Sequence, residues 1–148
     1  MIYYIDGYNV LFKNFTHNSL EDGRNALIDA FNDAASSLGL QITLVFDAQY
    51  VADFTRTHSR ALEIIYTDFG ETADDYILNM LENFPPKDQI TLVTSDKRLA
   101  CSARMLKAKT QSVASFISYL NKKMGSKETT KKSHTTNISP SSFSLEYE

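Results

Sequence analysis

The chain has 148 residues, about the size of one domain, of which 43% are hydrophobic and 22% charged. This composition is typical of a soluble globular protein and excludes collagen-like, coiled-coil and wholly disordered chains. The formal net charge of −3 conceals a segregation. Residues 1–96 have 15 acidic and 5 basic side chains, a net charge of −10, whereas residues 97–132 have 10 basic side chains and one acidic, a net charge of +9.

The start of the chain and its cysteine content indicate neither export nor a membrane. The N-terminus lacks a basic region and Asp6 interrupts its first apolar run, so no signal peptide is predicted. No apolar run approaches the roughly 18 residues that span a bilayer. Cys101 is the single cysteine, which excludes an intramolecular disulfide and favours a structural thiol in a reducing compartment. We therefore expect a cytoplasmic protein without a membrane partner.

Four short apolar runs predict buried strands, and helical patterns lie between and after them. The strands are expected at residues 2–5, 42–46, 62–66 and 90–93, and a short fifth strand fits residues 110–113. The helical stripes lie at residues 27–38, 77–84, 99–106 and 113–124. Ser19 with Asp22 predicts the start of the first helix and Gly39 its end. Strands that alternate with helices indicate an α/β fold with a mostly parallel sheet.

The last part of the chain has a different composition. The helical pattern stops near Gly125, and residues 125–148 are rich in Ser, Thr and Lys. A segment with so few apolar residues buries little surface, so we predict a flexible tail after a domain of residues 1–124. Residues 49–59 fit either a loop or a short helix.

Acidic side chains follow three predicted strands and begin a predicted helix. Asp6 follows the first strand, Asp47 the second and Asp96 the fourth, while Asp74 and Asp75 begin the second helix. In an open parallel sheet, ligands bind beyond the carboxyl ends of the strands. Two like charges 4 Å apart repel by roughly 4 kcal/mol at an effective dielectric near 20, so converging acids need a proton or a cation. Carboxylates without Cys or His neighbours suit one or two Mg²⁺ or Mn²⁺ ions, which can activate water.

Four of these acids also have a purely structural interpretation. Asp6 and Asp47 fit simple turns after their strands. Asp96 fits a helix N-cap, and Asp75 fits the third helical position of a capping box. Asp74 has no comparable structural task, so it favours a functional site more strongly than the others do.

Three other nucleotide-related sites fit less well. A haloacid-dehalogenase-type phosphatase needs an aspartate at the position that Tyr4 occupies. A response-regulator receiver needs an acidic neighbour that Asp6 lacks, and the chain has no P-loop or glycine-rich dinucleotide motif. A metal-dependent, nuclease-like acidic site remains.

The acids lie within longer motifs that resemble a known family. In chain order the motifs are Tyr4-Ile5-Asp6-Gly7-Tyr8-Asn9-Val10, then Arg24, then Val45-Phe46-Asp47-Ala48, then Ile64-Ile65-Tyr66-Thr67 with Glu71-Thr72-Ala73-Asp74, and Val93-Thr94-Ser95-Asp96. On these motifs, residues 1–124 resemble the YacP-like branch of the NYN domains, within the PIN-like ribonuclease superfamily. One departure is Gln49, where the family often has a histidine.

The resemblance implies a three-layer α/β/α fold, with a central mostly parallel sheet of four to five strands, and metal-dependent hydrolysis of RNA. The catalytic metal ligands that it implies are Asp6, Asp74 and Asp96. The supporting residues that it implies are Asn9, Asp47, Glu71, Asp75, Thr94 and Ser95. In this scheme Asn9 holds the loop after Asp6 or touches a phosphate, and Thr94 and Ser95 orient Asp96 or a bound water.

Basic and aromatic side chains supply the candidate RNA-binding surface. The basic candidates are Arg24, Lys97, Arg98, Arg104, Lys107 and Lys109, and those after Asp96 also fit an ordinary solvated helix surface. The stacking candidates are Tyr8, Phe12, Tyr50 and Phe54. For Phe12 and Phe54, packing in the core is the favoured interpretation. Arg24 fits either an RNA contact or a brace for an acid.

Two functions are compatible with these motifs. The leading hypothesis is a divalent-metal-dependent endoribonuclease that cleaves single-stranded RNA, including mRNA on the ribosome. The alternative is a catalytically silent RNA- or ribosome-binding module with the same fold. Retention of the three catalytic acids favours the nuclease.

Overall fold

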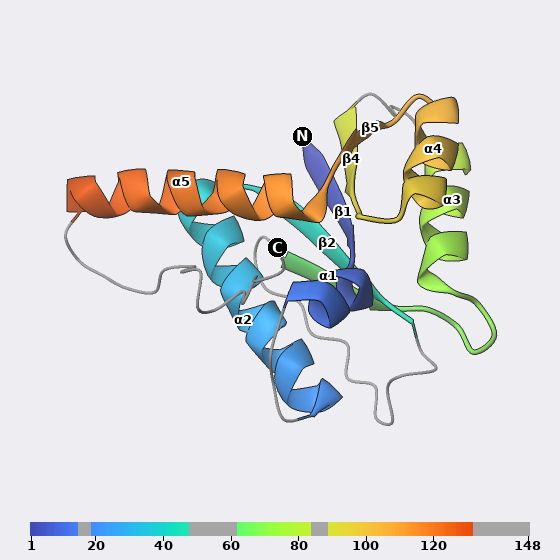
Figure 1. Ribbon diagram of the computed structural model, residues 1–148, viewed down its shortest axis with the longest axis horizontal. Helices are drawn as coiled ribbons and strands as arrows, with labels where there is room; N and C mark the ends of the chain where they lie inside the picture. The colour runs from blue at the N-terminus through green and yellow to red at the C-terminus, as the bar shows by residue number, and fades with distance from the viewer. Residues whose placement is uncertain (15–18, 48–61, 84–88, 132–148) are drawn as a thin grey trace.

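The architecture of the chain is seen in a computed structural model, which describes residues 1–14, 19–47, 62–83 and 89–131. The ten elements of these ranges are β1 (Ile2–Asp6), α1 (Gly7–Asn14), α2 (Leu20–Leu38), β2 (Gln41–Phe46), β3 (Leu62–Tyr66), α3 (Ala73–Asn83), β4 (Ile90–Val93), α4 (Lys97–Met105), β5 (Lys109–Gln111) and α5 (Val113–Lys131). Helices and strands alternate from β3 to α5 as expected, whereas α1 and α2 are consecutive helices and β2 and β3 are separated by residues outside the described ranges (Figure 1). None of the described helices is both long and apolar enough to cross a membrane.

The five strands form one sheet in the order β3-β2-β1-β4-β5, and every neighbouring pair is parallel. β1 lies at the centre, where Ile5 is aligned with Leu44 of β2 on one side and with Val93 of β4 on the other. The apolar runs lack alternation because both faces of the sheet are covered. The expected mostly parallel sheet is confirmed.

Helices cover the two faces of the sheet in separate groups. On one face, α1, α2 and α5 pack against alternate strand residues that include Ile5, Leu44 and Val93. On the other face, α3 and α4 pack against the intervening residues, which include Tyr4 and Val45. Figure 1 shows α3 and α4 together at one side of the sheet and α2 and α5 at the other. The three-layer α/β/α arrangement is therefore confirmed.

The strand order reverses direction at β1, which creates the position where ligands bind in open α/β sheets. The chain proceeds from β1 outwards to β2 and β3, and then returns to place β4 on the opposite side of β1. Connections that diverge in this way leave a crevice beyond the carboxyl ends of the two central strands. The residues that follow β1 and β4 border this position.

The helix termini confirm some local predictions. The hydroxyl of Ser19 accepts a hydrogen bond from the backbone N–H of Asp22 at 3.1 Å and begins α2. Gly39, with a φ of 68°, ends α2 in the left-handed conformation that glycine tolerates best. α5 continues to Lys131, so the predicted boundary between residues 124 and 125 falls inside a helix. Residues 132–148 of the predicted tail lie outside the described residues, as do residues 49–59.

Helix α1 was not expected, because Asp6-Gly7 has the appearance of a turn. Gly7 is instead the first residue of the helix, and a Cβ placed on it would overlap the aromatic ring of Phe46. Glycine therefore permits α1 to begin directly at the end of β1 and close to β2. This close approach places the residues that follow Asp6 against the sheet rather than in an open loop.

Candidate active site

Four partly buried aspartates gather at the carboxyl-end edge of the sheet, which we call the acidic edge: Asp6, Asp47, Asp74 and Asp96. Asp6 is the last residue of β1, and Asp47 directly follows β2. Asp96 follows β4 and caps α4, while Asp74 is the second residue of α3. Four segments that are distant in the sequence thus contribute one carboxyl group each.

Asp6 is the electrostatic centre of the acidic edge. The pKa of its carboxyl group is raised from 3.8 to about 7. Burial is the largest cause, and the charges of Asp74, Asp96 and Asp47 act in the same direction. The backbone N–H of Asn9 opposes the shift by donating a hydrogen bond to Asp6 Oδ1 at 3.4 Å. The repulsion expected from converging acids is therefore present, and the Asp6 carboxyl holds a proton over part of the neutral pH range.

Asp74 shares this environment with Asp6. Its pKa is raised by burial first, and then by the charges of Asp96, Asp75 and Asp47. A side-chain hydrogen bond with Asp6 acts in the opposite direction. Because each of Asp6 and Asp74 affects the pKa of the other, the two carboxyl groups titrate as a coupled pair. A proton on this pair reduces the repulsion between the carboxyl groups, as a bound cation would.

Asn9 joins the two central strands beyond their carboxyl ends. Its backbone N–H donates to Asp6 Oδ1, and its side-chain Oδ1 accepts a hydrogen bond from the backbone N–H of Ser95 at 2.9 Å. Ser95 is 86 residues away in the sequence. This bridge supports the predicted role of Asn9 in holding the loop after Asp6.

The backbone around Asp96 is held by its neighbours. The backbone N–H of Asp96 donates to the hydroxyl of Thr94 at 3.1 Å, and Thr94 is only 4% exposed. Asp96 Oδ1 accepts hydrogen bonds from the backbone N–H groups of Arg98 at 2.9 Å and Leu99 at 3.2 Å. The N-cap interpretation of Asp96 is thus confirmed, and the cap uses one of the two carboxylate oxygens.

Two acids that were grouped with the site have structural tasks. Asp75 and Thr72 form a reciprocal capping box at the start of α3, with hydrogen bonds of 3.0 and 3.5 Å. The Glu71 carboxylate accepts a hydrogen bond from the backbone N–H of Asp68 at 3.4 Å within the preceding turn. Both residues shape the chain that carries Asp74.

Tyr8 and Arg24 form a contact within the protein. Tyr8 is 3% exposed, and its ring stacks on Phe12 and meets the edge of Phe46. Arg24 Nη1 donates a hydrogen bond to the Tyr8 hydroxyl at 3.2 Å. The buried Tyr8 ring has no face available for an RNA base, because it packs against the core. Arg24 therefore braces a buried tyrosine, whereas the sequence led us to expect a brace for an acid or an RNA contact.

Of the other stacking candidates, the structure describes only Phe12. Phe12 is 55% exposed on α1, so the expectation that it packs in the core was wrong. Tyr50 and Phe54 lie outside the described residues. Phe69, which the sequence reasoning missed, is 93% exposed in the connection between β3 and α3. An aromatic residue followed by Gly70 and flanked by acids, in a strand-to-helix connection, was the available signal.

The basic candidates of residues 97–109 separate into two groups. Lys97 and Arg98 begin α4 beside Asp96 and are exposed at the acidic edge. The second group lies exposed at the opposite, amino-end edge, which we call the basic edge after its three members Arg104, Lys107 and Lys109. Lys109 is aligned with Thr91 near the start of β4, and α4 crosses between the edges over about 13 Å. Only the first group adjoins the acids, since α4 runs opposite to the strands.

The donor chemistry of the acidic edge suits a hard cation. Within the described ranges, no group of three or more His, Cys, Asp or Glu side chains is arranged to hold a metal ion. The charge of Asp96 raises the pKa values of both Asp6 and Asp74. Ionising all three carboxyl groups is therefore unfavourable unless a cation offsets their repulsion. Carboxylate oxygens of this kind favour Mg²⁺ or Mn²⁺ over softer metals.

Comparisons with known proteins decide the family. The family model of the YacP-like NYN domain matches residues 3–146, which is nearly the whole chain. The chain belongs to the YacP-like NYN domain family. This confirms the resemblance, and it extends the match beyond residue 124 into the segment predicted as a tail.

Solved structures agree with this assignment. The crystal structure of Rae1 (YacP) from Bacillus subtilis is 25% identical, with a TM-score of 0.71, over 89% of this chain and 80% of that chain. A mutant form of the same protein is 26% identical, with a TM-score of 0.66, over 88% of this chain and 84% of that chain. No curated protein matches the chain. The YacP-like NYN chain therefore has a nuclease-like, RNA-related fold.

Proposed function

We propose that this YacP-like NYN domain is a divalent-metal-dependent endoribonuclease that hydrolyses single-stranded RNA. The observation that carries the proposal is the acidic edge, where Asp6 is buried at the end of the central strand and its pKa is raised to about 7. Burying several like charges at a ligand-binding edge destabilises the fold, and groups with pKa values perturbed in this way are typical of functional sites. Membership of a family that is generally nucleolytic supports the same conclusion.

In this proposal Asp6, Asp74 and Asp96 are the residues that hold the metal. A divalent cation, when bound, supplies an activated water and neutralises charge on the scissile phosphate. Asp6 and Asp74 would both have to be ionised to hold the cation, so its binding would be favoured by loss of the proton from Asp6. Asn9 fixes the backbone of Asp6, and the Thr94 hydroxyl fixes that of Asp96. Asp47 adds negative charge that favours cation binding.

Basic side chains next to the acids offset the repulsion between this edge and RNA. Lys97 and Arg98 are exposed at the start of α4, one and two residues after Asp96. We propose that these two side chains bind the phosphates that flank the scissile bond. We also propose mRNA, including ribosome-bound mRNA, as the substrate, and the cytoplasm as the compartment.

The decisive experiment compares cleavage of an end-labelled single-stranded RNA by the wild-type chain and by Asp6→Asn, with Mg²⁺ or Mn²⁺. We expect cleavage by the wild type, loss of cleavage in excess chelator, and loss in Asp6→Asn. Cleavage that is unchanged in the variant, or in chelator, would contradict the metal-nuclease mechanism.

A silent RNA- or ribosome-binding module is the second candidate. It is favoured by one observation, namely that the described residues contain no ready-made group of three metal-binding side chains. Binding of RNA or ribosomes by the wild-type chain, with no cleavage under any of the metal conditions, would select this candidate over the nuclease.

A further inference from the structure

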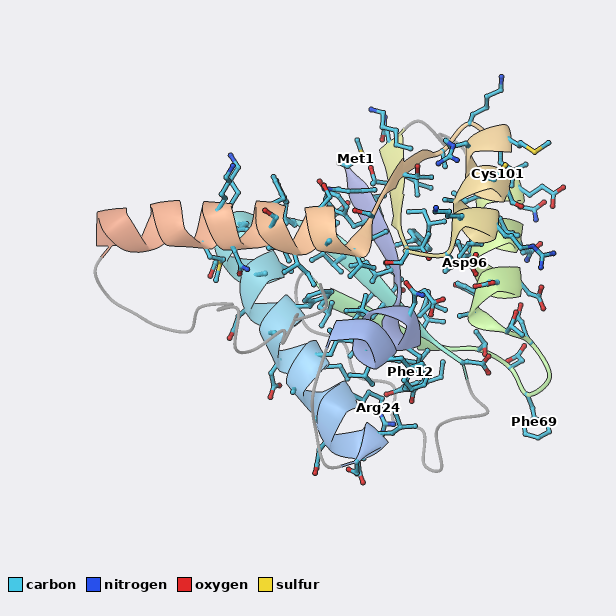
Figure 2. The ribbon with its side chains drawn as sticks, viewed as in Figure 1. Met1, Phe12, Arg24, Phe69, Asp96 and Cys101 are labelled. Carbon is cyan, nitrogen blue, oxygen red and sulfur yellow. The ribbon has the colours of Figure 1, made fainter. Side chains whose placement is uncertain are left out.

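The connection between β3 and α3 presents one aromatic ring to solvent at the acidic edge. Phe69 is 93% exposed, more than the other large hydrophobic residues that are exposed in the described ranges, which are Met1, Phe12 and Met105. Figure 2 shows its ring at the tip of the connection, directed away from the body of the protein. A phenylalanine this exposed contributes nothing to the core, so its ring is available to a ligand.

A tight turn holds the ring in this position. The backbone N–H of Glu71 donates to the carbonyl of Asp68 at 2.9 Å, and Gly70 has a φ of 92°. This is the pattern of a type II turn, in which Phe69 occupies the first central position and glycine the second. The turn itself requires Gly70 but places no demand for an aromatic residue at Phe69.

Side-chain hydrogen bonds on both sides reinforce the turn. The Glu71 carboxylate accepts from the backbone N–H of Asp68 at 3.4 Å, and the Thr67 hydroxyl donates to the Glu71 carbonyl at 2.7 Å. Thr67 is itself buried, with its backbone N–H bonded to the carbonyl of Phe46 at 3.0 Å. A rigid support lowers the entropy lost when the ring binds a partner.

The turn is close to the acids in the chain. Phe69 precedes Asp74 by five residues, which limits their separation to roughly 17 Å even in an extended chain. An RNA strand whose scissile phosphate lies at Asp74 therefore has bases within reach of the ring. Unpaired bases stack on aromatic rings regardless of their sequence.

We propose that Phe69 is a stacking residue that holds an unpaired base of RNA beside the acidic edge. The proposal rests on the RNA substrate of the proposed function, but it requires only binding and not turnover. The neighbouring Asp68 and Glu71 repel phosphates, so the ring takes the base while the backbone phosphates lie toward Lys97 and Arg98. Phe69 would thereby select single strands over duplexes, whose bases are stacked internally.

The test measures RNA binding by the full chain carrying Asp6→Asn, which prevents cleavage. The probe is a single-stranded oligoadenylate with 2-aminopurine, whose fluorescence falls when the base stacks. Adding Phe69→Ala is expected to weaken binding about tenfold and to remove the quenching. Phe69→Tyr should retain both. Met105→Ala, which removes a side chain that is 77% exposed at the end of α4 far from Asp96, is the matched control and should leave both unchanged.

A second measurement separates stacking from general damage to the fold. An abasic ribose-phosphate strand of the same length should bind equally to chains with and without Phe69→Ala. In the otherwise wild-type enzyme, Phe69→Ala should raise KM and leave kcat unchanged, because the base contact exists before and during the reaction.

The outcomes distinguish this proposal from the proposed function. Equal oligoadenylate binding with and without Phe69→Ala, or equal losses on the normal and abasic strands, overturns the stacking role alone. A wild-type chain that binds RNA without cleaving it overturns the nuclease, while stacking is still decided by Phe69→Ala. A chain that binds no single-stranded RNA overturns both.

Discussion

The two edges of the sheet have opposite charge and different degrees of burial. At the acidic edge, carboxyl groups such as Asp6 are partly buried, coupled and held by hydrogen bonds from Asn9. At the basic edge, Arg104, Lys107 and Lys109 are exposed. Partly buried charges that share a proton are arranged for chemistry, whereas exposed charges contribute general attraction to phosphates. In the proposed function, the acidic edge is the site of cleavage and the basic edge only extends the area that attracts RNA.

The largest expected effect contrasts two adjacent acids of the same helix. Asp74→Asn should lower cleavage by at least about 100-fold, because it removes a proposed metal ligand. Asp75→Asn is the matched control. Asparagine keeps an oxygen that can accept the 3.5 Å bond from the Thr72 backbone N–H and loses only the negative charge in the first turn of α3, so it should lower stability by about 0.3–1 kcal/mol with little effect on cleavage. Single-turnover assays and urea unfolding of both variants measure the two effects. Equal loss of cleavage in both variants would contradict the assignment of Asp74 to the metal site and Asp75 to the helix cap.

The next prediction concerns pH. Because the pKa of Asp6 is raised to about 7, the folded chain binds more protons than the unfolded chain between about pH 4 and 7. Stability contributed by this group is therefore lost as the pH rises through that window. In chelator, the loss should reach at most about 4 kcal/mol.

Asp6→Asn should abolish this contribution and make the variant more stable than the wild type at pH 8. Urea unfolding at several pH values measures this contribution. Asp75→Asn is the control, and it should keep the wild-type dependence of stability on pH. A wild-type stability that is independent of pH in this window would show that Asp6 is not buried as described. Added Mg²⁺ or Mn²⁺ should restore stability to the wild type and not to Asp6→Asn.

A third prediction tests what allows the acidic edge to form. Gly7→Ala should destabilise the chain by about 1–3 kcal/mol, because its Cβ would overlap the Phe46 ring. Gly125→Ala in α5 meets no atom within 4 Å and should instead stabilise it by about 0.5–1 kcal/mol. Thermal unfolding of the two variants gives the comparison. Similar shifts of the same sign would mean that α1 has room to move away from β2.

The smallest effect is expected at the basic edge. Replacing Lys107 and Lys109 with glutamine should weaken single-stranded RNA binding a few-fold and reduce the log–log salt slope by about 1.4, with kcat unchanged. Replacing Lys97 and Arg98 should change the slope similarly but also lower kcat. If both pairs lower kcat equally, the two edges do not differ in function.

The sequence predicted the sheet well because its strands are covered on both faces, which makes each a continuous apolar run such as Ile90–Val93. It also placed Asp6, Asp74 and Asp96 at one edge, since parallel strands end on the same side. It did not predict α1 or the burial of Tyr8, because these depend on how closely Gly7 approaches Phe46 in a distant strand.

The distribution of the basic residues over two edges could not be predicted, for a different reason. Their closeness to Asp96 in sequence suggested one continuous flank, but α4 carries the chain back across the sheet before β5 begins. Phe69 was missed because its exposure depends on a turn closed by backbone and side-chain hydrogen bonds. Neither the course of α4 nor the exposure of Phe69 can be predicted from composition or periodicity alone.

The bridge between Asn9 and Ser95 also has a consequence for biosynthesis. Its two halves are 86 residues apart, so residues 1–89 contain Asp6 without the β4 segment that completes its surroundings. A ribosome must release the chain through β4 and α4 before the edge is assembled. The proposed nuclease is thus inert while it is being made, and a translation product truncated before Asp96 leaves no active cutting domain near the message that encoded it.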